Sequence, residues 1–370
     1  MPTLVVLAVI TVAVGRDLRS VPSRHAAKRV AHPTSGEAGT AAPAIAPSTL
    51  LLVHRGADGR ADLLTVGGVS TPKKRGPTAA SILLIPSATQ VETPSLGIQI
   101  LADLPNLGDA KLLTTTIENL LGVALTSSIE LDDTGLAAVL APAAPLPVRL
   151  RAPVRIADRD SETAIPAGDQ TLSASDAARV ITAHESGSEL DHLVTVQAVL
   201  EGWQARLRDR SIAQATEAIR PGLAVMTTAA KARERVDSLS VDSFTTGGGE
   251  RFQPRRDDIT DYVRTAFPAA LLGPGGKRPR VEILNGTGAV GLAQQIAAVV
   301  VPAGGDVRLT GNVPGFGVPT TQVVYYRDQD RPAAEHLLAA LKCGGLKRAD
   351  TALGMVDVTI LVGADCKPSS

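Results

Sequence analysis

The segment Val281–Val300, VEILNGTGAVGLAQQIAAVV, decides the fold of the C-terminal part of the chain. Its first residues alternate between apolar and polar side chains, which is typical of a half-buried strand. Gly286, Gly288 and Gly291 follow with the spacing G-x-G-x-x-G, and apolar residues then recur at helical intervals. A strand, a glycine-rich turn and a helix are the context in which a dinucleotide-binding fingerprint is found.

Two observations argue against a nucleotide site in this segment. The next predicted strand, Asp306–Thr310, ends in Gly311 and Asn312, where a ribose-binding Asp or Glu is expected. Only about 60 residues follow, which is too few for a doubly wound domain of the usual size. We therefore predict that Gly286–Gly291 serves a tight turn and close packing of the strand against the helix.

The remaining elements complete a small α/β domain at the C-terminus. We predict strands at Gln322–Tyr326 and Val356–Val362 and a helix at Pro332–Leu341. The resulting order β-α-β-β-α-β is typical of a ferredoxin-like, split βαβ domain.

Three segments of this domain resemble a known family. They read VEILNGTG from Val281, TTQVVYY from Thr320 and DVTILVGADC from Asp357. Together they are similar to the C-terminal domain attached to many LytR-CpsA-Psr (LCP) proteins of actinobacteria, and the predicted domain spans 280–367. The resemblance implies that an LCP domain precedes it in the chain.

Composition restricts the classes of function. The chain has 370 residues, enough for two domains, with 37 basic and 37 acidic side chains and only 2% aromatic residues. Balanced charge and scarce aromatic side chains argue against nucleic acid as a partner. Cys343 and Cys366 are the two cysteines, and an even count in an exported chain indicates a disulfide. A zinc site is disfavoured, because two Cys without a His pair do not fill a tetrahedral shell.

The first 47 residues show no globular pattern. The apolar run Leu4–Val14 is shorter than the roughly 20 residues that span a bilayer, and it suits the hydrophobic region of a signal peptide. A buried N-terminal strand is the alternative for this run. We expect a signal or anchor over 1–15, a flexible linker over 16–47, and an extracytoplasmic protein that is membrane-anchored at its N-terminus.

Strand and helix signals alternate over 48–272 and predict a three-layer α/β/α domain. Asp109 and Ser173 are expected to cap helices at their N-termini, and Gly122 is expected to end one. The predicted strands begin at Thr49, Ala61, Ser81, Ser127 and Val148, and the predicted helices span Asp109–Gly122, Asp133–Leu140, Ser173–Thr182, Leu190–Ala218, Leu223–Val236 and Asp257–Phe267.

Landmarks of the LCP domain recur over Ser48–Asp209. Gly59–Asp62, followed by LLTV, resembles the segment that supplies the first metal-binding Asp of the family. Glu189–Leu200 stands where the family reads D-x-x-R-x-x-R-Q-x-x-x-L. The resemblance implies a domain that holds a polyprenyl-pyrophosphate lipid and transfers its glycan to a cell-wall acceptor. Further landmarks are Ser81–Gly97, Glu118–Val123, Ile129–Leu140 and Ile165–Ile181.

Most residues that would carry this chemistry are replaced. In the family, Asp carboxylates hold a cation at the pyrophosphate, and Arg side chains meet phosphate oxygens two at a time. Asp62 keeps the expected metal-binding carboxylate, and the candidate phosphate-binding residues that remain are Arg55, Arg60 and Arg179. The positions of the family's other Arg and Asp residues carry Ser87, Ala88, Ile181, Ala183, His192 and Thr195.

Other polar clusters are expected to be solvated surface. Glu185, Glu189 and Asp191 lie near His184 with loop-like spacing, and Lys73–Arg75 forms a basic loop. The sequence contains no G-x-S-x-G elbow, H-E-x-x-H pair or P-loop lysine, so hydrolase and nucleotidase functions have no supporting motif.

The sequence therefore predicts a cell-envelope protein that has the LCP fold without the LCP active site. Its expected role is non-catalytic, namely to bind a cell-wall polymer, a lipid-linked glycan precursor or an envelope protein, without a cofactor. The alternative is a working glycopolymer transferase that uses unfamiliar residues and Mg²⁺. The arginine set separates the two hypotheses and favours the first.

Overall fold

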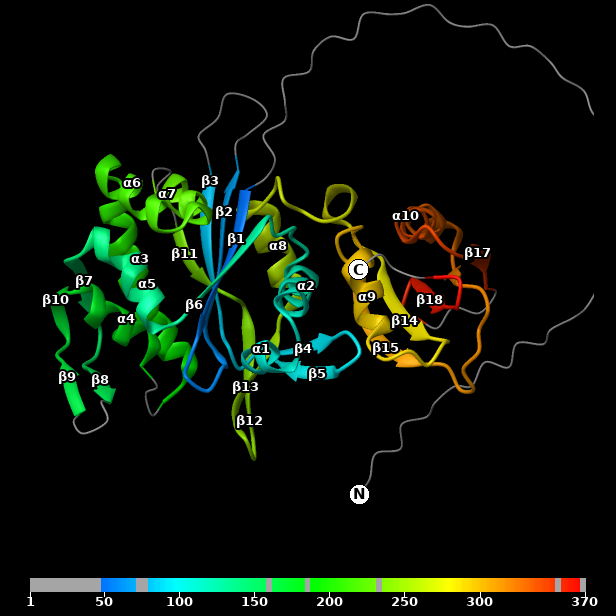
Figure 1. Ribbon diagram of the computed structural model, residues 1–370, viewed down its shortest axis with the longest axis horizontal. Coiled ribbons are helices and arrows are strands. Elements are labelled where there is room, and N and C mark those ends of the chain that lie inside the picture. The colour runs from blue at the N-terminus through cyan, green and yellow to red at the C-terminus, as the bar shows by residue number, and fades with distance from the viewer. Residues whose placement is uncertain are drawn as a thin grey trace, which may run out of the picture. The chain divides into compact units, whose positions relative to one another are not determined.

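A five-stranded sheet forms the centre of the first part of the chain (Figure 1). β1, β2 and β3 form an antiparallel meander, and β6 and β11 add in parallel to β1 and β3. The computed structural model describes residues 48–70, 79–157, 162–183, 187–230, 235–349 and 354–366. In the order β11-β3-β2-β1-β6, the strands are Arg235–Ser238, Ala79–Ile85, Ala61–Ser70, Ser48–Arg55 and Ser127–Leu131.

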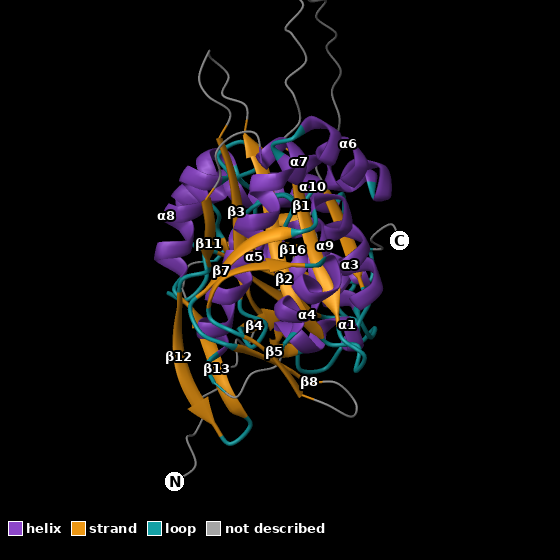
Figure 2. Ribbon diagram, turned by 90° about the vertical axis from the view of Figure 1, so that its left-hand side faces the viewer, coloured by secondary structure: helices purple, strands orange, loops and turns teal. Residues whose placement is uncertain are grey.

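Both faces of this sheet are buried because its strands alternate apolar side chains between them. Leu50 and Leu52 of β1 contribute to one core, whereas Leu51 and Val53 contribute to the other. Helices cover both faces (Figures 1 and 2), which confirms the predicted three layers. The first core includes side chains of α3 (Asp133–Leu140), α4 (Ala174–Thr182), α5 (Glu189–Leu207) and α7 (Ala224–Ala230), and the second includes those of α2 (Ala110–Leu121) and α8 (Arg256–Ala266).

Local capping explains why several helices match their predicted bounds. Asp109 accepts a hydrogen bond from the Leu112 amide at 2.9 Å, and Gly122 ends α2 in the left-handed conformation with φ 69°. Ser173 accepts a bond from the Asp176 amide at 3.1 Å and opens α4. These side chains satisfy backbone groups that a helix end leaves unpaired.

Two predicted helices are wrong in extent. The helix expected over Leu190–Ala218 is divided, because Asp209 accepts a bond from the Ser211 amide at 2.8 Å and caps a new helix, α6 (Arg210–Ile219). Its hydrogen bonds from Ser211 lower the pKa of Asp209. The helix expected over Leu223–Val236 ends with α7, and β11 follows as a strand paired with β3.

Several short hairpins escape the sequence patterns. Where one strand was predicted to begin at Val148, the chain forms two strands, each paired with a later one. The glycines at 247–249 turn a hairpin. These pairs are β7–β10 (Leu146–Leu150, Gly168–Leu172), β8–β9 (Val154–Ala157, Glu162–Ile165), β4–β5 (Gln90–Thr93, Gly97–Ile100) and β12–β13 (Val241–Thr246, Gly249–Pro254), and α1 (Leu104–Leu107) is a further short helix.

The C-terminal part contains a second five-stranded sheet, in the order β15-β14-β18-β16-β17. It is an α/β domain as predicted, but the ferredoxin-like strand order is wrong. β14 and β15 are parallel direct neighbours, as are β16 and β17, so neither βαβ unit is split. β18 enters between the two units and pairs antiparallel with β16. The strands are Arg280–Asn285, Asp306–Asn312, Gln322–Tyr325, Gly345–Arg348 and Val358–Val362, and the helices are α9 (Leu292–Val300) and α10 (Arg331–Leu341).

The predicted disulfide is present in this second part. It joins Cys343, just after α10, to Cys366, just after β18, with a Cα–Cα distance of 5.2 Å. Residues 45–370 form one compact unit, so the boundary between the two predicted domains stays a prediction. Within the described ranges no helix is both long and apolar enough to cross a membrane. The predicted signal, linker and basic loop, and His184, lie outside those ranges.

Removing the disulfide is expected to destabilise the protein. Its loop closes over a sequence separation of 23 residues, and a bridge of that size restricts the unfolded chain by about 3 kcal/mol. The double variant Cys343→Ala, Cys366→Ala should lose about that much free energy of unfolding in urea. Wild-type protein in excess reductant is the control and should match the variant. Free thiols that label in native, unreduced protein would contradict the bridge.

Candidate functional site

Several of the predicted active-site positions lie at one edge of the first sheet. Asp62 lies at the start of β2, and Ser87 and Ala88 follow directly after β3. β1, β3, β6 and β11 point the same way, so their carboxyl ends share this edge. In open α/β sheets ligands bind beyond the carboxyl ends of the strands. The edge is the natural position for a ligand site in this fold.

An internal carboxylate occupies the loop after β3. Glu189, in the first turn of α5, accepts hydrogen bonds from the amides of Ser87 and, at 3.1 Å, Ala88. Ser87 and Ala88 stand where the resemblance expects an Arg and an Asp. The prediction that Glu189 belongs to a solvated surface cluster is therefore wrong, since its carboxylate is bound by backbone donors of a distant loop.

A second carboxylate occupies the N-terminus of α5. The hydroxyl of Ser188 and the amide of Glu189 both donate to Glu250 of β13, each at 3.0 Å. A helix N-terminus carries partial positive charge and favours an anion, which here is the protein's own side chain. His192, at a position where the family has Arg, lies 2.8 Å from the carbonyl oxygen of Ile181 through Nε2.

Asp62 faces a buried histidine. Nδ1 of His54 lies 3.6 Å from Oδ2 of Asp62, and its Nε2 lies 3.1 Å from Oδ1 of Asp133, at the start of α3. His54 is fully buried, and the Asp62 side chain is 13% exposed. Among the described residues, no group of three or more His, Cys, Asp or Glu is placed to hold a metal ion. These residues do not fit an LCP-type Mg²⁺ site, so we derive no step through a metal.

The three predicted phosphate-binding arginines are each engaged by the protein itself. Each has a carboxylate of the protein within 4.0 Å, and that carboxylate offsets its charge. The pairs are Arg55–Glu130 at 3.4 Å, Arg60–Asp103 at 3.2 Å and Arg179–Asp176 at 4.0 Å.

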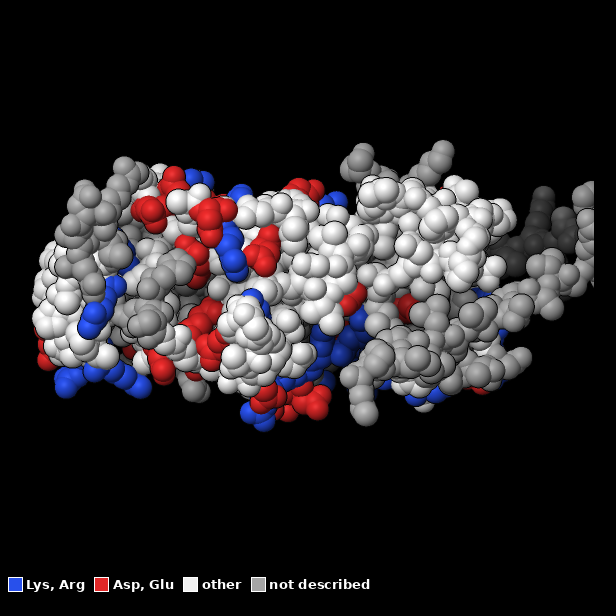
Figure 3. Space-filling model, turned by 90° about the horizontal axis from the view of Figure 1, so that it is seen from below, with Lys and Arg blue, Asp and Glu red and all other residues white. Residues whose placement is uncertain are grey.

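Carboxylates of the protein therefore occupy much of the edge, beside a cavity of about 230 Å³ lined by Arg55, Glu130, Leu131, Asp132 and Arg220. Backbone donors that suit a phosphate oxygen bind Glu189 and Glu250, and the nearby arginines are paired. A pyrophosphate entering there meets like charges, which repel it. Figure 3 shows acidic and basic side chains interspersed on the face seen there.

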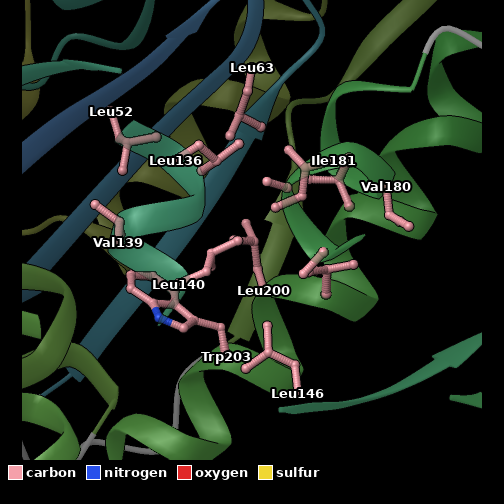
Figure 4. Close-up of a cluster of buried hydrophobic side chains, with 14 of the residues drawn as sticks. Leu52, Leu63, Leu136, Val139, Leu140, Leu146, Val180, Ile181, Leu200 and Trp203 are labelled. Carbon is pink, nitrogen blue, oxygen red and sulfur yellow. The ribbon is translucent and has the colours of Figure 1, made fainter. Parts of the chain in front are cut away.

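The apolar layer behind this edge is closely packed. Side chains from the sheet and from α3, α4 and α5 point toward one another around Trp203, which is 1% exposed (Figure 4). Leu63, Leu136 and Ile181, also drawn there, are each at most 2% exposed. Protein side chains thus fill the space on this side of the sheet.

The glycine-rich turn after β14 is closed by its own side chain. Oδ1 of Asn285 accepts hydrogen bonds from the amides of Thr287 at 3.0 Å and Gly288 at 3.1 Å. A Cβ on Gly286 would lie 2.6 Å from the carbonyl oxygen of Val362, so this glycine permits close packing. Gly288 adopts φ +83°, which favours glycine. Amides that would hold a pyrophosphate are used within the turn.

Sequence reasoning missed the residues that fill the edge. Glu189 and Glu250 contact segments distant in sequence, and no local pattern links Glu189 to Ser87. The partner of Asp62 was also missed, although His54 ends the apolar run of β1 and offered a weak signal as a polar residue in a buried strand.

Comparison with known proteins supports the resemblance. Residues 278–365 match the family described as LytR cell envelope-related transcriptional attenuator. TagV of B. subtilis is 17% identical, with a TM-score of 0.51, over 62% of this chain and 99% of its own. Protein gbs0355 from Streptococcus agalactiae is 10% identical, with a TM-score of 0.50, over 60% and 88%. The LytR-Csp2A-Psr enzyme from Actinomyces oris is 17% identical, with a TM-score of 0.45, over 58% and 89%.

These findings confirm the predicted resemblance for both parts of the chain, but at different levels. The C-terminal part is a LytR C-terminal domain, and the preceding part has the LCP fold. At identities of 10–17% the structural likeness establishes the fold alone. A comparison with curated proteins found no match.

Removal of the Glu189 carboxylate should destabilise the protein. Glu189→Ala leaves the amides of Ser87 and Ala88 without their acceptor, which should cost roughly 1–3 kcal/mol in the free energy of unfolding. Glu201→Ala, on the exposed side of the same helix, is the control and should change stability by less than about 0.5 kcal/mol. Equal losses in the free energy of unfolding of the two variants, measured by urea titration, would show that Glu189 is an ordinary surface residue.

The glycine-rich turn is expected to bind no dinucleotide, because Asn285 uses its amides. Calorimetric titration of the wild-type protein with NAD, NADP or FAD should give no heat of binding. Micromolar affinity that disappears in Gly288→Val would overturn our interpretation of this turn.

Proposed function

We propose that this chain, which joins an LCP fold to a LytR C-terminal domain, is an exported cell-envelope protein that binds without catalysing glycan transfer. Its ligand is a cell-wall polymer, a lipid-linked glycan precursor or an envelope protein. The observation that carries the proposal is the carboxylate of Glu189 on the amides of Ser87 and Ala88. This carboxylate takes the place where the family's Arg and Asp would face a pyrophosphate.

The energetic argument rests on what a pyrophosphate would have to replace. Hydrogen bonds from charged donors contribute roughly 1.5–3 kcal/mol each, and the chain lacks most of the arginines that would supply them. To use the loop amides, the ligand would also have to displace Glu189, which would then need another partner. Arg55 and Arg60 would have to leave Glu130 and Asp103.

Asp62 does not restore the chemistry by itself. Transfer needs a cation held beside the pyrophosphate and several donors that stabilise charge on the leaving group. Asp62 instead faces His54, which also lies 3.1 Å from Asp133. A single carboxylate paired with a histidine is a poor ligand set for Mg²⁺, which prefers oxygen ligands.

Export is part of the proposal and is supported by two features. The disulfide between Cys343 and Cys366 suits an oxidising compartment. The apolar run Leu4–Val14 suits a signal or anchor segment. An envelope location also agrees with the description of the family that matches 278–365.

A transfer assay tests the proposal directly. Purified protein is given a polyprenyl-pyrophosphate glycan, Mg²⁺ and a peptidoglycan acceptor, and product is followed by mass spectrometry. We expect no transfer above the protein-free background, and Asp62→Ala should not differ from the wild type. The physical reason is that the edge offers paired arginines and acidic side chains to a diphosphate.

An LCP protein with the complete arginine set serves as the positive control for substrate and acceptor. Turnover by the wild-type chain that is lost in Asp62→Ala would overturn the proposal. It would make the glycopolymer transferase the preferred function.

A further inference from the structure

Two adjoining cavities in the unit of residues 45–370 share three arginines. One has a volume of about 290 Å³ and the other of about 540 Å³. Arg256 of α8, Arg280 of β14 and Arg308 of β15 line both. Lys and Arg side chains gather in one region of the face shown in Figure 3. These cavities do not include the edge residues discussed above, such as Glu189 and Asp62.

The smaller cavity is strongly cationic. Its walls also contain aliphatic side chains, including Leu120 and Val263, which lower the local dielectric and strengthen charge interactions. Among the described residues that line it, Asp306 is the one with an acidic side chain. The basic residues in its lining are Arg256, Arg264, Lys277, Arg278, Arg280 and Arg308.

Asp306 is shared by two of these arginines. It lies 2.6 Å from Arg308 and 3.6 Å from Arg256. Burial lowers the pKa of Arg256, and the charge of Arg308 lowers it further, although Asp306 and Glu92 oppose both effects. One carboxylate therefore balances only part of the charge around it.

Arg278 holds the cavity wall in place. It donates to the carbonyl oxygen of Asn119 at 2.8 Å, to Oδ1 of Asn119 at 2.9 Å and to the carbonyl oxygen of Gly305 at 2.5 Å. Its Nε is buried and has no hydrogen-bond partner within the described part of the chain. Burial lowers the pKa of Arg278 to about 10, so the group stays charged at neutral pH. Its hydrogen-bond acceptors are neutral, and the carboxylates of Asp306 and Glu118 offset only part of its charge.

The larger cavity adds one carboxylate, which offsets little of the positive charge, and an apolar rim. Glu92 lines it and accepts a hydrogen bond from Thr310 at 3.1 Å, and burial raises the pKa of Glu92. Asp357, which lines neither cavity, pairs with Arg280 at 2.9 Å. Ile98 and Leu309 line the same cavity and are 67% and 38% exposed.

We propose that the cavity pair around Arg256 and Arg308 is a binding site for a phosphate or diphosphate group. Arg suits this ligand because its planar fork meets two phosphate oxygens at once. The proposal deepens the proposed function, on which it rests, since it names the site and the chemical class of the envelope ligand. The anion would supply the negative charge that Asp306 and Glu92 do not provide.

The test uses inorganic pyrophosphate as the probe and the full chain in low-salt buffer. Calorimetry should show saturable binding, and both Arg256→Gln and Arg308→Gln should weaken it about ten-fold or more. Arg149→Gln is the matched control, because Arg149 is 81% exposed and pairs with Asp169 on a distant hairpin. Its affinity should equal that of the wild type. Binding should also weaken at 0.5 M NaCl, because salt screens charge.

Thermal unfolding without ligand shows whether each variant is folded. If Arg308→Gln fails to fold, Arg308→Lys keeps the charge and removes the fork, and it should bind more weakly than the wild type. Absence of saturable binding by the folded wild-type chain would overturn the proposal. Equal affinity in the wild type, Arg256→Gln and Arg308→Gln would also overturn it.

A second probe distinguishes the source of the phosphate. Dodecyl phosphate, used below its micellar concentration, carries a phosphate monoester beside an apolar chain, and inorganic phosphate is its counterpart without the chain. Tighter binding of dodecyl phosphate than of inorganic phosphate assigns the site to a lipid phosphate that uses the rim at Ile98 and Leu309. Equal or weaker binding assigns it to the phosphate of a polymer or a free anion. The transfer assay is independent, so failure of this site leaves the non-catalytic proposal standing, and turnover dependent on Asp62 leaves this site standing.

Discussion

Burial of the central sheet on both faces is the constraint on which the rest of the structure depends. Each residue of β1 from Leu50 to Val53 is at most 5% exposed, so substitution of any of them disturbs one of the two cores. The helices that cover the faces are held by the same side chains. The loops beyond the strand ends are not subject to this packing constraint. The scaffold therefore persists while the residues at its edge change.

The edge illustrates how a fold keeps a loop after its charged side chains are lost. The amides of Ser87 and Ala88 are fixed by the strand that precedes them and need an acceptor when they are removed from water. Glu189 supplies it from α5, as Glu250 does for the start of that helix. A carboxylate has the charge and oxygen geometry that such donors favour. An internal anion thus stabilises donors that would suit an external one.

The sequence was informative where local chemistry determines structure. Asp109, Gly122 and Ser173 act on backbone groups within four residues, so the ends of α2 and α4 could be predicted. Asp209 offered the same kind of signal, but apolar periodicity on both sides concealed the break between α5 and α6. The Glu189 contacts with Ser87 and Ala88 join residues about 100 positions apart. No single-sequence pattern specifies a pairing of that kind.

The order of the second sheet was beyond prediction for a related reason. Periodicity identifies strands and helices, but βαβ units of similar length form either split or adjacent pairs, and the choice depends on where β18 inserts. The same limit applies to charge. Equal numbers of basic and acidic residues suggest no preferred partner. The fold nevertheless places Arg256, Arg280 and Arg308 together. At the edge of the first sheet it pairs Arg55 with Glu130 and Arg60 with Asp103. Local fields, which attract ligands, follow from this placement and not from the total charge.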